Sequence, residues 1–368
     1  MHFDAPQPLS HSCSTQIGET TDNVAQASIR ELSIHQYKID LEPALPVASQ
    51  RINQRLGLII SATFDNCAPE FVEIAPLSGV DIQGEPLTGF SPESLSQVTE
   101  YLEQQLPSLI GQPIKALNEL ANQAPFASIG LGLSLLGFKS SSQFQYAHVD
   151  ERKVGLFYYK DDTSIETLTQ QVNALPIGTY SIKVKVAQAS IEQEIAFIHQ
   201  ILAINPKLKL RLDANQGFNV EQAIEFLACL PKQAIEYIEE PCKTPEQSQL
   251  VYQSLHIPFA LDETLNDGHY QFEMLEGLAA LIIKPMVLGN IDKLVQLINL
   301  ATSHGVRCIL SSSLEANLGI GDLAKLAAVL TPDEIPGLDT LASFTQPLMN
   351  SDNQLNLEVC QLLQHYQG

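Results

Sequence analysis

Five charged residues recur at similar intervals in the second half of the chain, in the order cation, acid, acid, acid, cation. They are Lys185, Asp213, Glu239, Asp262 and Lys284. The successive gaps are 28, 26, 23 and 22 residues, and each residue follows a short apolar stretch. Each gap has the length of one strand–helix unit. We therefore expect the five side chains to lie side by side at the carboxyl ends of consecutive parallel strands.

This set of side chains indicates a particular chemistry. Three carboxylates without histidine or cysteine form an all-oxygen donor set, which suits Mg²⁺ or Mn²⁺ and not zinc. The acids repel one another, so a divalent cation is needed to hold all three ionised. Lysines beside a metal should have lowered pKa values and could move protons. The predicted reaction is metal-assisted removal of a proton α to a carboxylate, through an enediolate, followed by elimination or reprotonation.

Strand alternation adds two residues to this ring. Alternate residues of a strand share a face, so we expect Lys183 and Arg211 one layer deeper than Lys185 and Asp213. A buried lysine and a buried arginine need anionic neighbours, which the three carboxylates would supply.

Each of these residues also has an ordinary structural explanation when it is taken alone. Alternating lysines usually mark a solvated strand edge, and an acid at a strand end usually caps a turn. The ordered series on five consecutive strands argues against coincidence. Strand alternation argues against Glu240 and Glu263 as direct ligands. Cys242 has no histidine in its motif and is expected to be a packed small residue.

The regular alternation of short apolar strands and amphipathic helices after residue 154 predicts a TIM-like (β/α)7β barrel. No Gly-x-Gly-x-x-Gly motif follows a strand, which argues against a dinucleotide-binding fold. The expected strands are Val154–Tyr158, Tyr180–Val186, Leu208–Ala214, Ile235–Glu239, Phe259–Asp262, Ala280–Lys284, Arg307–Ser311 and a weak eighth near Gly337–Thr340.

The first third of the chain predicts a smaller α+β capping domain. Strands over Ser33–Leu41, Leu56–Ala62 and Phe71–Ala75 indicate an antiparallel meander. One helix is expected to begin at Ser91-Pro92-Glu93, with a hydroxyl cap and an acid in its first turn, and another covers about 125–136. We predict a flexible arm over 1–31, the capping domain over 32–135 joined by segment 342–368, and the barrel over 136–341.

Composition limits the partners. The chain has 368 residues, of which 45% are hydrophobic and 17% charged, with a net charge of −22. That charge argues against nucleic acid and anionic membranes, and an anionic substrate would need local cations. There is no apolar run long enough to span a membrane, and no secretory signal. The six cysteines have no metal-ligand spacing, which predicts free thiols and a cytoplasmic location. The oligomeric state stays open.

Several motifs together resemble a known family. They are Ile182–Val186, Leu210–Asn215, Glu239–Thr244, Leu261–Thr264, Ile283–Pro285, Leu310–Glu315 and Pro336–Thr340, with Glu73–Gly79 and Phe90–Ser94 from the first third. On these motifs the chain resembles the enolase superfamily. Its two lysines are similar to those of the muconate-lactonizing-enzyme subgroup. The Ser-Ser-Ser-x-Glu and Pro-Gly-Leu-Asp-Thr segments look most like the o-succinylbenzoate synthase family of menaquinone biosynthesis.

The resemblance implies a Mg²⁺-dependent lyase that dehydrates 2-succinyl-6-hydroxy-2,4-cyclohexadiene-1-carboxylate, a small dicarboxylate, to o-succinylbenzoate. Lys185 would be the base that removes the α proton and then the acid that assists departure of hydroxide, on one face of the substrate. The resemblance further implies Asp213, Glu239 and Asp262 as metal ligands, Lys284 and Lys183 as electrostatic supports, and Arg211, Asn215, Ser311 and Ser312 as substrate-binding or orienting residues. Loops around 46–55 would cap the mouth.

Other functions remain open at the level of sequence. The same two-lysine ring would serve an N-acylamino acid racemase or a dipeptide epimerase, because reprotonation uses the same lysines as elimination. A non-catalytic binding barrel would not need all five charged residues. A Schiff-base lyase using Lys284 would leave the three acids unexplained.

Overall fold

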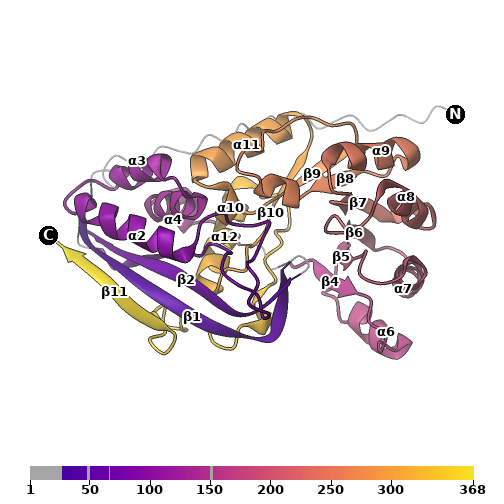
Figure 1. Cartoon of the computed structure of the whole chain (residues 1–368), viewed down its shortest axis with the longest axis horizontal. Coiled ribbons are helices and arrows are strands. Elements are labelled where there is room, and N and C mark those ends of the chain that lie inside the picture. Colours follow the sequence, from indigo (N-terminus) through magenta and orange to yellow (C-terminus); the bar gives the residue numbers. More distant parts are fainter. Residues whose placement is uncertain (1–26, 48–49, 66, 150–151) are drawn as a thin grey trace.

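The computed structural model describes residues 27–47, 50–65, 67–149 and 152–368. Of the predicted flexible arm, 1–31, residues 1–26 lie outside the described residues. Residues 29–31 belong to the first strand. Figure 1 shows an antiparallel sheet with its helices at one end of the molecule and a parallel sheet with its helices at the other.

The antiparallel sheet has the strand order β11–β1–β2–β3. Its strands are β1 (Ile29–Val47), β2 (Gln50–Phe64), β3 (Glu70–Ile74) and β11 (Cys360–Gln367). The helices of this part are α2 (Leu95–Gln105), η1 (Leu106–Leu109), α3 (Lys115–Gln123), α4 (Ala127–Phe138) and α5 (Ser142–Gln145). The C-terminal strand β11 thus pairs with β1, the first strand in the sequence.

Helix α4 is buried almost throughout, from Ser128 to Phe138. Gly132 allows its close approach to the antiparallel sheet, because a Cβ there would overlap the Ile74 side chain. The sequence of α4 is apolar on every side, which is typical of a helix covered on all faces. It packs against β3 on one side and against the barrel helices α10 and α11 on another.

The predicted start of the first helix was wrong by one turn. Helix α2 begins at Leu95, and its cap is Ser94, whose hydroxyl accepts from the Gln97 amide in a capping box. Ser91 accepts from the Leu77 amide instead. Glu93 is buried and accepts from the Ser128 amide and hydroxyl, at the start of α4. Tertiary contact with a second helix therefore outweighed the local signal.

The parallel sheet has seven strands in the order β10–β9–β8–β7–β6–β5–β4. They are β4 (Gly155–Tyr158), β5 (Ser181–Lys185), β6 (Lys209–Asp213), β7 (Ile235–Glu239), β8 (Phe259–Leu261), β9 (Leu278–Ile283) and β10 (Arg307–Leu310). The connecting helices are α6 (Ile165–Asn173), α7 (Ile191–Ile204), α8 (Val220–Ala228), η2 (Lys232–Ala234), α9 (Pro245–Leu255), η3 (Glu263–Asn266), α10 (Pro285–Leu288), α11 (Ile291–Ser303) and α12 (Asn317–Leu330), followed by η4 (Leu341–Ser343). Sequential order and outer helices confirm the TIM-like architecture with an α+β cap (Figure 1).

The inner face of this sheet carries a small apolar layer below the polar residues. Its buried members are Tyr237, Ala260, Ala280, Ile282 and Ile309. Tyr237, Ala260 and Ile282 each stand two residues before a member of the predicted ring, so they share its face. The outer face packs against the helices in the main core. Strand alternation thus directs the charged ends into the barrel.

The predicted eighth strand near Gly337–Thr340 is reduced to one parallel bridge between Ser311 and Gly337. Pro336 has no amide hydrogen and so cannot donate to a ladder, and Gly337 approaches Ser311 closely, since a Cβ there would lie 3.0 Å from the Ser311 hydroxyl. Within the described residues, β4 and β10 therefore form the two edges of a curled sheet. An ion pair of 2.8 Å between Lys153 and Asp339 links the segments that flank these edges.

Two further expectations concern the whole chain. Among the described residues, none of the helices combines the length and the apolar character needed to cross a bilayer. Cys67, Cys229, Cys242, Cys308 and Cys360 are free thiols. Cys13 lies outside the described residues.

Candidate active site

The predicted ring comes together at the carboxyl ends of β5 to β9. Lys183 lies at its centre, with its Nζ 2.9 Å from Asp213 Oδ2 and 2.8 Å from Glu239 Oε1. The side chains of Asp213 and Glu239 are 2% and 1% exposed, so their charges have little access to water. Lys183 is therefore the nearest counter-charge to both acids.

Lys185 lies beside this group and is also partly exposed. Its Nζ donates to Asn215 Oδ1 at 2.8 Å and lies 3.4 Å from Asp213 Oδ2. Its side chain is 24% exposed. An ammonium group held at one side and open at the other is suited to exchange a proton with a bound molecule.

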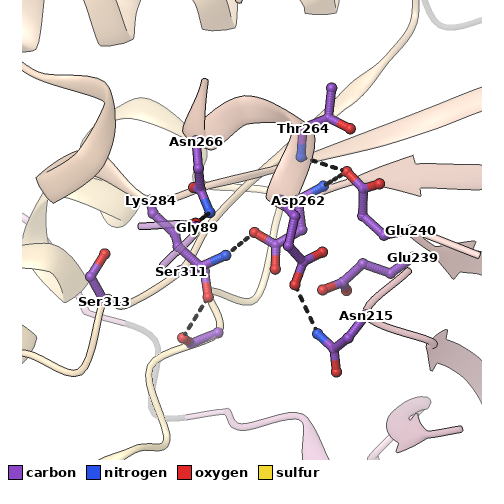
Figure 2. A network of polar contacts seen from close by, with 12 residues as sticks. Gly89, Asn215, Glu239, Glu240, Asp262, Thr264, Asn266, Lys284, Ser311 and Ser313 are labelled. Atoms are coloured by element: carbon purple, nitrogen blue, oxygen red, sulfur yellow. Dashed lines mark hydrogen bonds and ion pairs between the residues drawn. The ribbon is translucent and has the colours of Figure 1, made fainter. Parts of the chain in front are cut away.

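Lys284 contacts Asp262 from the far side of the ring, as Figure 2 shows. Both side chains are buried, and both stand just past the ends of their strands, β9 and β8. The two acid–lysine groups therefore approach the same space from opposite sides of the barrel mouth.

The backbone turns sharply where these strands end. Positive φ angles occur at Ala187, Asn215, Gln216 and Glu240, with values of 62°, 43°, 61° and 39°. Apart from asparagine, such residues rarely adopt this conformation, which costs energy and is concentrated at functional sites. This strain recurs in the loops after β5, β6 and β7, which carry the ring, and is also found at His256, Leu314 and Asn353.

Glu240 and Glu263 differ in their hydrogen-bond partners. Glu240 is fully buried and accepts from the Asp262 and Thr264 amides at 2.9 and 2.8 Å, so it holds the turn that carries Asp262 (Figure 2). Glu263 accepts from Asn215 Nδ2 at 2.9 Å, and its second oxygen has no hydrogen-bond partner. Glu263 begins η3, after β8 has ended at Leu261, and the expectation that it is not a direct ligand stays a prediction.

The charged groups of the ring shift one another's pKa values. Burial, together with repulsion from Asp213 and Asp262, raises the pKa of Glu239 well above its usual range. The Asp213 pKa falls to about 2, because Lys183 and Lys185 outweigh the effect of burial. Burial and the neighbouring charge of Asp262 raise the pKa of Glu263 to about 7. The site holds more acid than its lysines neutralise.

The carboxylates of the ring raise the pKa values of Lys183 and Lys284, and the lowering expected beside a bound metal stays a prediction. Burial alone would lower the pKa of Lys183, but Asp213 and Glu239 raise it well above its usual range. The pKa of Lys284 rises for the same reason, since Asp262 outweighs burial. The nearest charges to both ammonium groups are carboxylates.

The donor set fits a divalent cation by its chemistry. Asp213, Glu239 and Asp262 are buried and close enough to repel one another. Within the described ranges, no three His, Cys, Asp or Glu side chains already stand in a metal-holding arrangement. Instead, Lys183 and Lys284 lie against the three acids. All-oxygen donors and an excess of negative charge are what Mg²⁺ and Mn²⁺ require.

Arg211 has partners of its own below the ring. Its Nε lies 3.0 Å from Glu236 Oε2, its guanidinium is 4.0 Å from Glu334, and it lies 5.8 Å from the centroid of the Tyr237 ring. The expectation that the three ring carboxylates neutralise Arg211 was therefore wrong. Its predicted role in orienting substrate stays a prediction.

The serine residues lie at the end of β10. The Ser311 amide donates to Ile283 O at 2.8 Å, and its hydroxyl donates to Gly337 O at 3.2 Å. Ser312 Oγ lies 3.1 Å from Thr340 Oγ1. Figure 2 places Ser311 in the same view as Lys284 and Asp262. Their predicted contact with a substrate arm stays a prediction.

Cys242 is fully buried, and burial raises its thiol pKa to about 11. At neutral pH such a thiol is protonated and weakly nucleophilic. This agrees with the expected role of a packed small residue.

Residues of the cap reach the barrel mouth. Asn266 donates to Gly89 O at 2.9 Å, and the Lys284 Nζ lies 5.9 Å from the centroid of the Phe90 ring. Arg55 donates to Leu314 O at 2.8 Å. Of the loop expected to cap the mouth, 46–55, residues 48 and 49 lie outside the described residues.

Comparison with known proteins agrees with this geometry. Residues 168–355, just over half of the chain, match the family described as enolase C-terminal domain-like. The chain belongs to the enolase superfamily. Among solved structures of the superfamily, a member from Roseovarius nubinhibens complexed with magnesium has a TM-score of 0.70 at 16% identity, covering 93% of this chain and 100% of that chain. A dipeptide epimerase from Enterococcus faecalis, complexed with Mg and a dipeptide, has a TM-score of 0.69 at 20% identity, covering 93% and 98%.

Closer relatives within the superfamily are named o-succinylbenzoate synthase. The protein from Aliivibrio fischeri strain MJ11 is 30% identical over 337 residues, 91% of this chain and 97% of the relative. The protein from Pectobacterium atrosepticum is 31% identical over 316 residues, covering 85% and 91%. The resemblance found in the motifs is confirmed, and so is the prediction that the chain is an enzyme.

Proposed function

We propose that this enzyme catalyses the Mg²⁺-dependent syn dehydration of 2-succinyl-6-hydroxy-2,4-cyclohexadiene-1-carboxylate to o-succinylbenzoate, the reaction of menaquinone biosynthesis. The proposal rests chiefly on the buried ring in which Lys185 and Lys284 flank three carboxylates. The relatives named o-succinylbenzoate synthase, which match over nearly their whole length, support the choice of substrate. A cytoplasmic location is part of the same proposal.

Lys185 acts as the base in this proposal. Its neutral form takes the proton from the carbon next to the substrate carboxylate, and the resulting ammonium then donates that proton to the departing hydroxide. Both steps use one group on one face, so the elimination is syn. Asn215 accepts from Lys185 at 2.8 Å and fixes where the amine points. Aromatisation of the ring drives the step forward.

The negative charge that develops on the carboxylate must be stabilised. Asp213, Glu239 and Asp262 would hold Mg²⁺, which when bound supplies positive charge next to the substrate carboxylate. Lys284 lies opposite Lys185 and remains an ammonium ion, since Asp262 raises its pKa. Lys183, between two of the acids, contributes fixed positive charge and keeps their side chains in place.

The remaining predicted residues would hold the substrate in place. Ser311 and Ser312 would bind the succinyl arm from the end of β10, and loops of the capping domain, residues 32–135, would exclude water. Asn266 and Gly89 already join the two parts at this point. We further propose that segment 342–368 belongs to this cap and residues 136–341 to the barrel.

Direct turnover tests this function. The protein is incubated with the cyclohexadiene substrate and Mg²⁺, and loss of the diene absorbance is followed with and without a chelator. We expect chelator-sensitive formation of o-succinylbenzoate that Lys185→Ala abolishes. A folded, Mg²⁺-loaded protein that leaves the diene unchanged would disprove the assignment.

Epimerisation is the second candidate, because solved structures similar in fold include dipeptide epimerases. That likeness, at 20% identity, concerns the fold, so it is weaker support than the relatives above. Exchange of the α proton of N-succinylamino acids or dipeptides in deuterated water distinguishes the two functions. Exchange without diene turnover would establish the racemase or epimerase.

A further inference from the structure

The row of ring residues continues onto the edge strand β4. In the register of the parallel sheet, Tyr158 pairs with Lys185, Lys185 with Asp213, and Asp213 with Glu239. Residues in register on neighbouring parallel strands share a face of the sheet. Tyr158 therefore faces the same space as the base and two of the three acids.

Leu156 occupies the matching position one layer deeper, in register with Lys183. It is 51% exposed, and Tyr158 is 42% exposed, whereas Phe157 between them is buried in the core on the outer face. Inward positions of a barrel strand are normally covered by other side chains. Here they form an uncovered apolar surface directly beside Lys185.

The Tyr158 ring has a cationic neighbour. Lys160 Nζ lies 4.6 Å from the ring centroid, a cation–π contact. The ring thus offers a flat surface next to the proposed catalytic lysine.

We propose that Tyr158 and Leu156 form a wall that receives the flat diene of the substrate ring and presents the α carbon to Lys185. This inference rests on the proposed function and adds the residues that recognise the ring. The carboxylates of such a substrate are bound by cations, and its ring hydroxyl is the leaving group, but the conjugated diene of the ring has no polar atom for them to hold. An aromatic face beside an aliphatic side chain is the surface on which a flat ring packs well.

The test compares steady-state kinetics of variants with the cyclohexadiene substrate. We expect Tyr158→Ala to raise KM about tenfold while kcat changes less than about threefold, because ground-state packing is lost. Leu156→Ala should raise KM by a smaller factor. Tyr158→Phe should restore a low KM, since it keeps the ring. Tyr180→Ala, an exposed tyrosine just before β5 at the other end of the barrel, is the matched control and should leave KM unchanged.

Calorimetric binding provides a second readout. Tyr158→Ala should weaken binding of o-succinylbenzoate, which has the ring, and leave binding of succinate, which has only the arm, unchanged. Equal weakening of both ligands would indicate a general disturbance of the site and overturn the inference. Wild-type turnover with an unchanged KM in Tyr158→Ala would overturn the wall and leave the proposed function standing. Absence of wild-type turnover would overturn both.

Discussion

The barrel interior contains two ionic clusters, which differ in their residues and in the role they are suited to. The mouth cluster consists of Lys183, Lys185, Asp213, Glu239, Asp262, Glu263 and Lys284. The floor cluster consists of Arg211, Glu236, Arg307 and Glu334, linked by contacts of 2.7 to 4.0 Å. Strand β6 supplies both clusters, with Arg211 and Asp213 only two residues apart.

The difference between the clusters lies in charge balance and in the kind of cation. The floor has two arginines and two glutamates, so its charges cancel, and arginine keeps its proton at any ordinary pH. The mouth has four carboxylates and three lysines, and lysine can release a proton. The balanced cluster is suited to hold strands together, and the unbalanced one to bind a cation and move a proton.

Exchanging the cation types is the strongest way to break this comparison. Lys185→Arg keeps the positive charge but removes the group that can act as a base. We expect kcat to fall about 10²–10⁴-fold with little change in the melting temperature. The control is Lys209→Arg, at the start of β6, where Lys209 donates to the Gln233 carbonyl. Full activity in Lys185→Arg would show that another group removes the proton.

The reverse exchange tests the floor. Arg211→Lys loses the planar guanidinium that contacts Glu236 and Tyr237. We expect a loss of about 1–3 kcal/mol in the free energy of unfolding, measured in urea, with kcat/KM unchanged within about threefold. A KM that rises tenfold or more at unchanged stability would support the alternative, in which Arg211 orients the substrate.

Stabilisation by Mg²⁺ should distinguish the acids of the mouth cluster from those of the floor cluster. At a Mg²⁺ concentration 100 times the dissociation constant, a single site stabilises the fold by about 2.7 kcal/mol. We expect Mg²⁺ to raise the melting temperature of the wild type but not of Asp213→Asn. Glu334→Gln, in the floor cluster, should keep the shift. Equal shifts in both variants would place the ion elsewhere.

A third cluster, between the cap and the barrel, sharpens the comparison. Glu73 accepts from the Ala316 and Gly319 amides at 2.9 and 2.8 Å, and Glu315 lies buried nearby. Burial and the charge of Glu73 raise the pKa of Glu315 to about 7. Arg55 is the cation of this cluster, which also holds the two carboxylates. A proton on Glu315 therefore reduces the excess negative charge of the cluster.

This cluster predicts a pH dependence of stability. A carboxyl whose pKa is raised in the folded state binds its proton more tightly there. The protonated carboxyl therefore stabilises the fold at low pH, and this stabilisation is lost as pH rises from about 4.5 to 7. The loss is on the order of 3 kcal/mol at most. Glu315→Gln cannot titrate and should reduce the slope of unfolding free energy against pH between pH 5 and 7.5, where Glu263 still titrates. An unchanged slope would contradict the assignment.

The sequence carried enough information to predict the barrel and its ring. Helices and strands there alternate with little ambiguity, and the acids and lysines sit one strand–helix unit apart. Glu263 and Tyr158 were not found in this way. Glu263 reaches Asn215 through the turn η3, and Tyr158 is related to Lys185 by strand register. Neither relation is visible without knowing where each strand ends and which residue faces which.

By itself, the sequence determined which chemical groups exist and which strand ends they share, because strand periodicity and the length of a strand–helix unit are local properties of the chain. The tertiary structure decided which charges meet. Arg211 was expected among the ring carboxylates but pairs with Glu236, and Glu93 was expected to begin one helix but caps another. Each pairing depends on distances between residues that are 25 and 35 positions apart, which only packing of the whole chain sets.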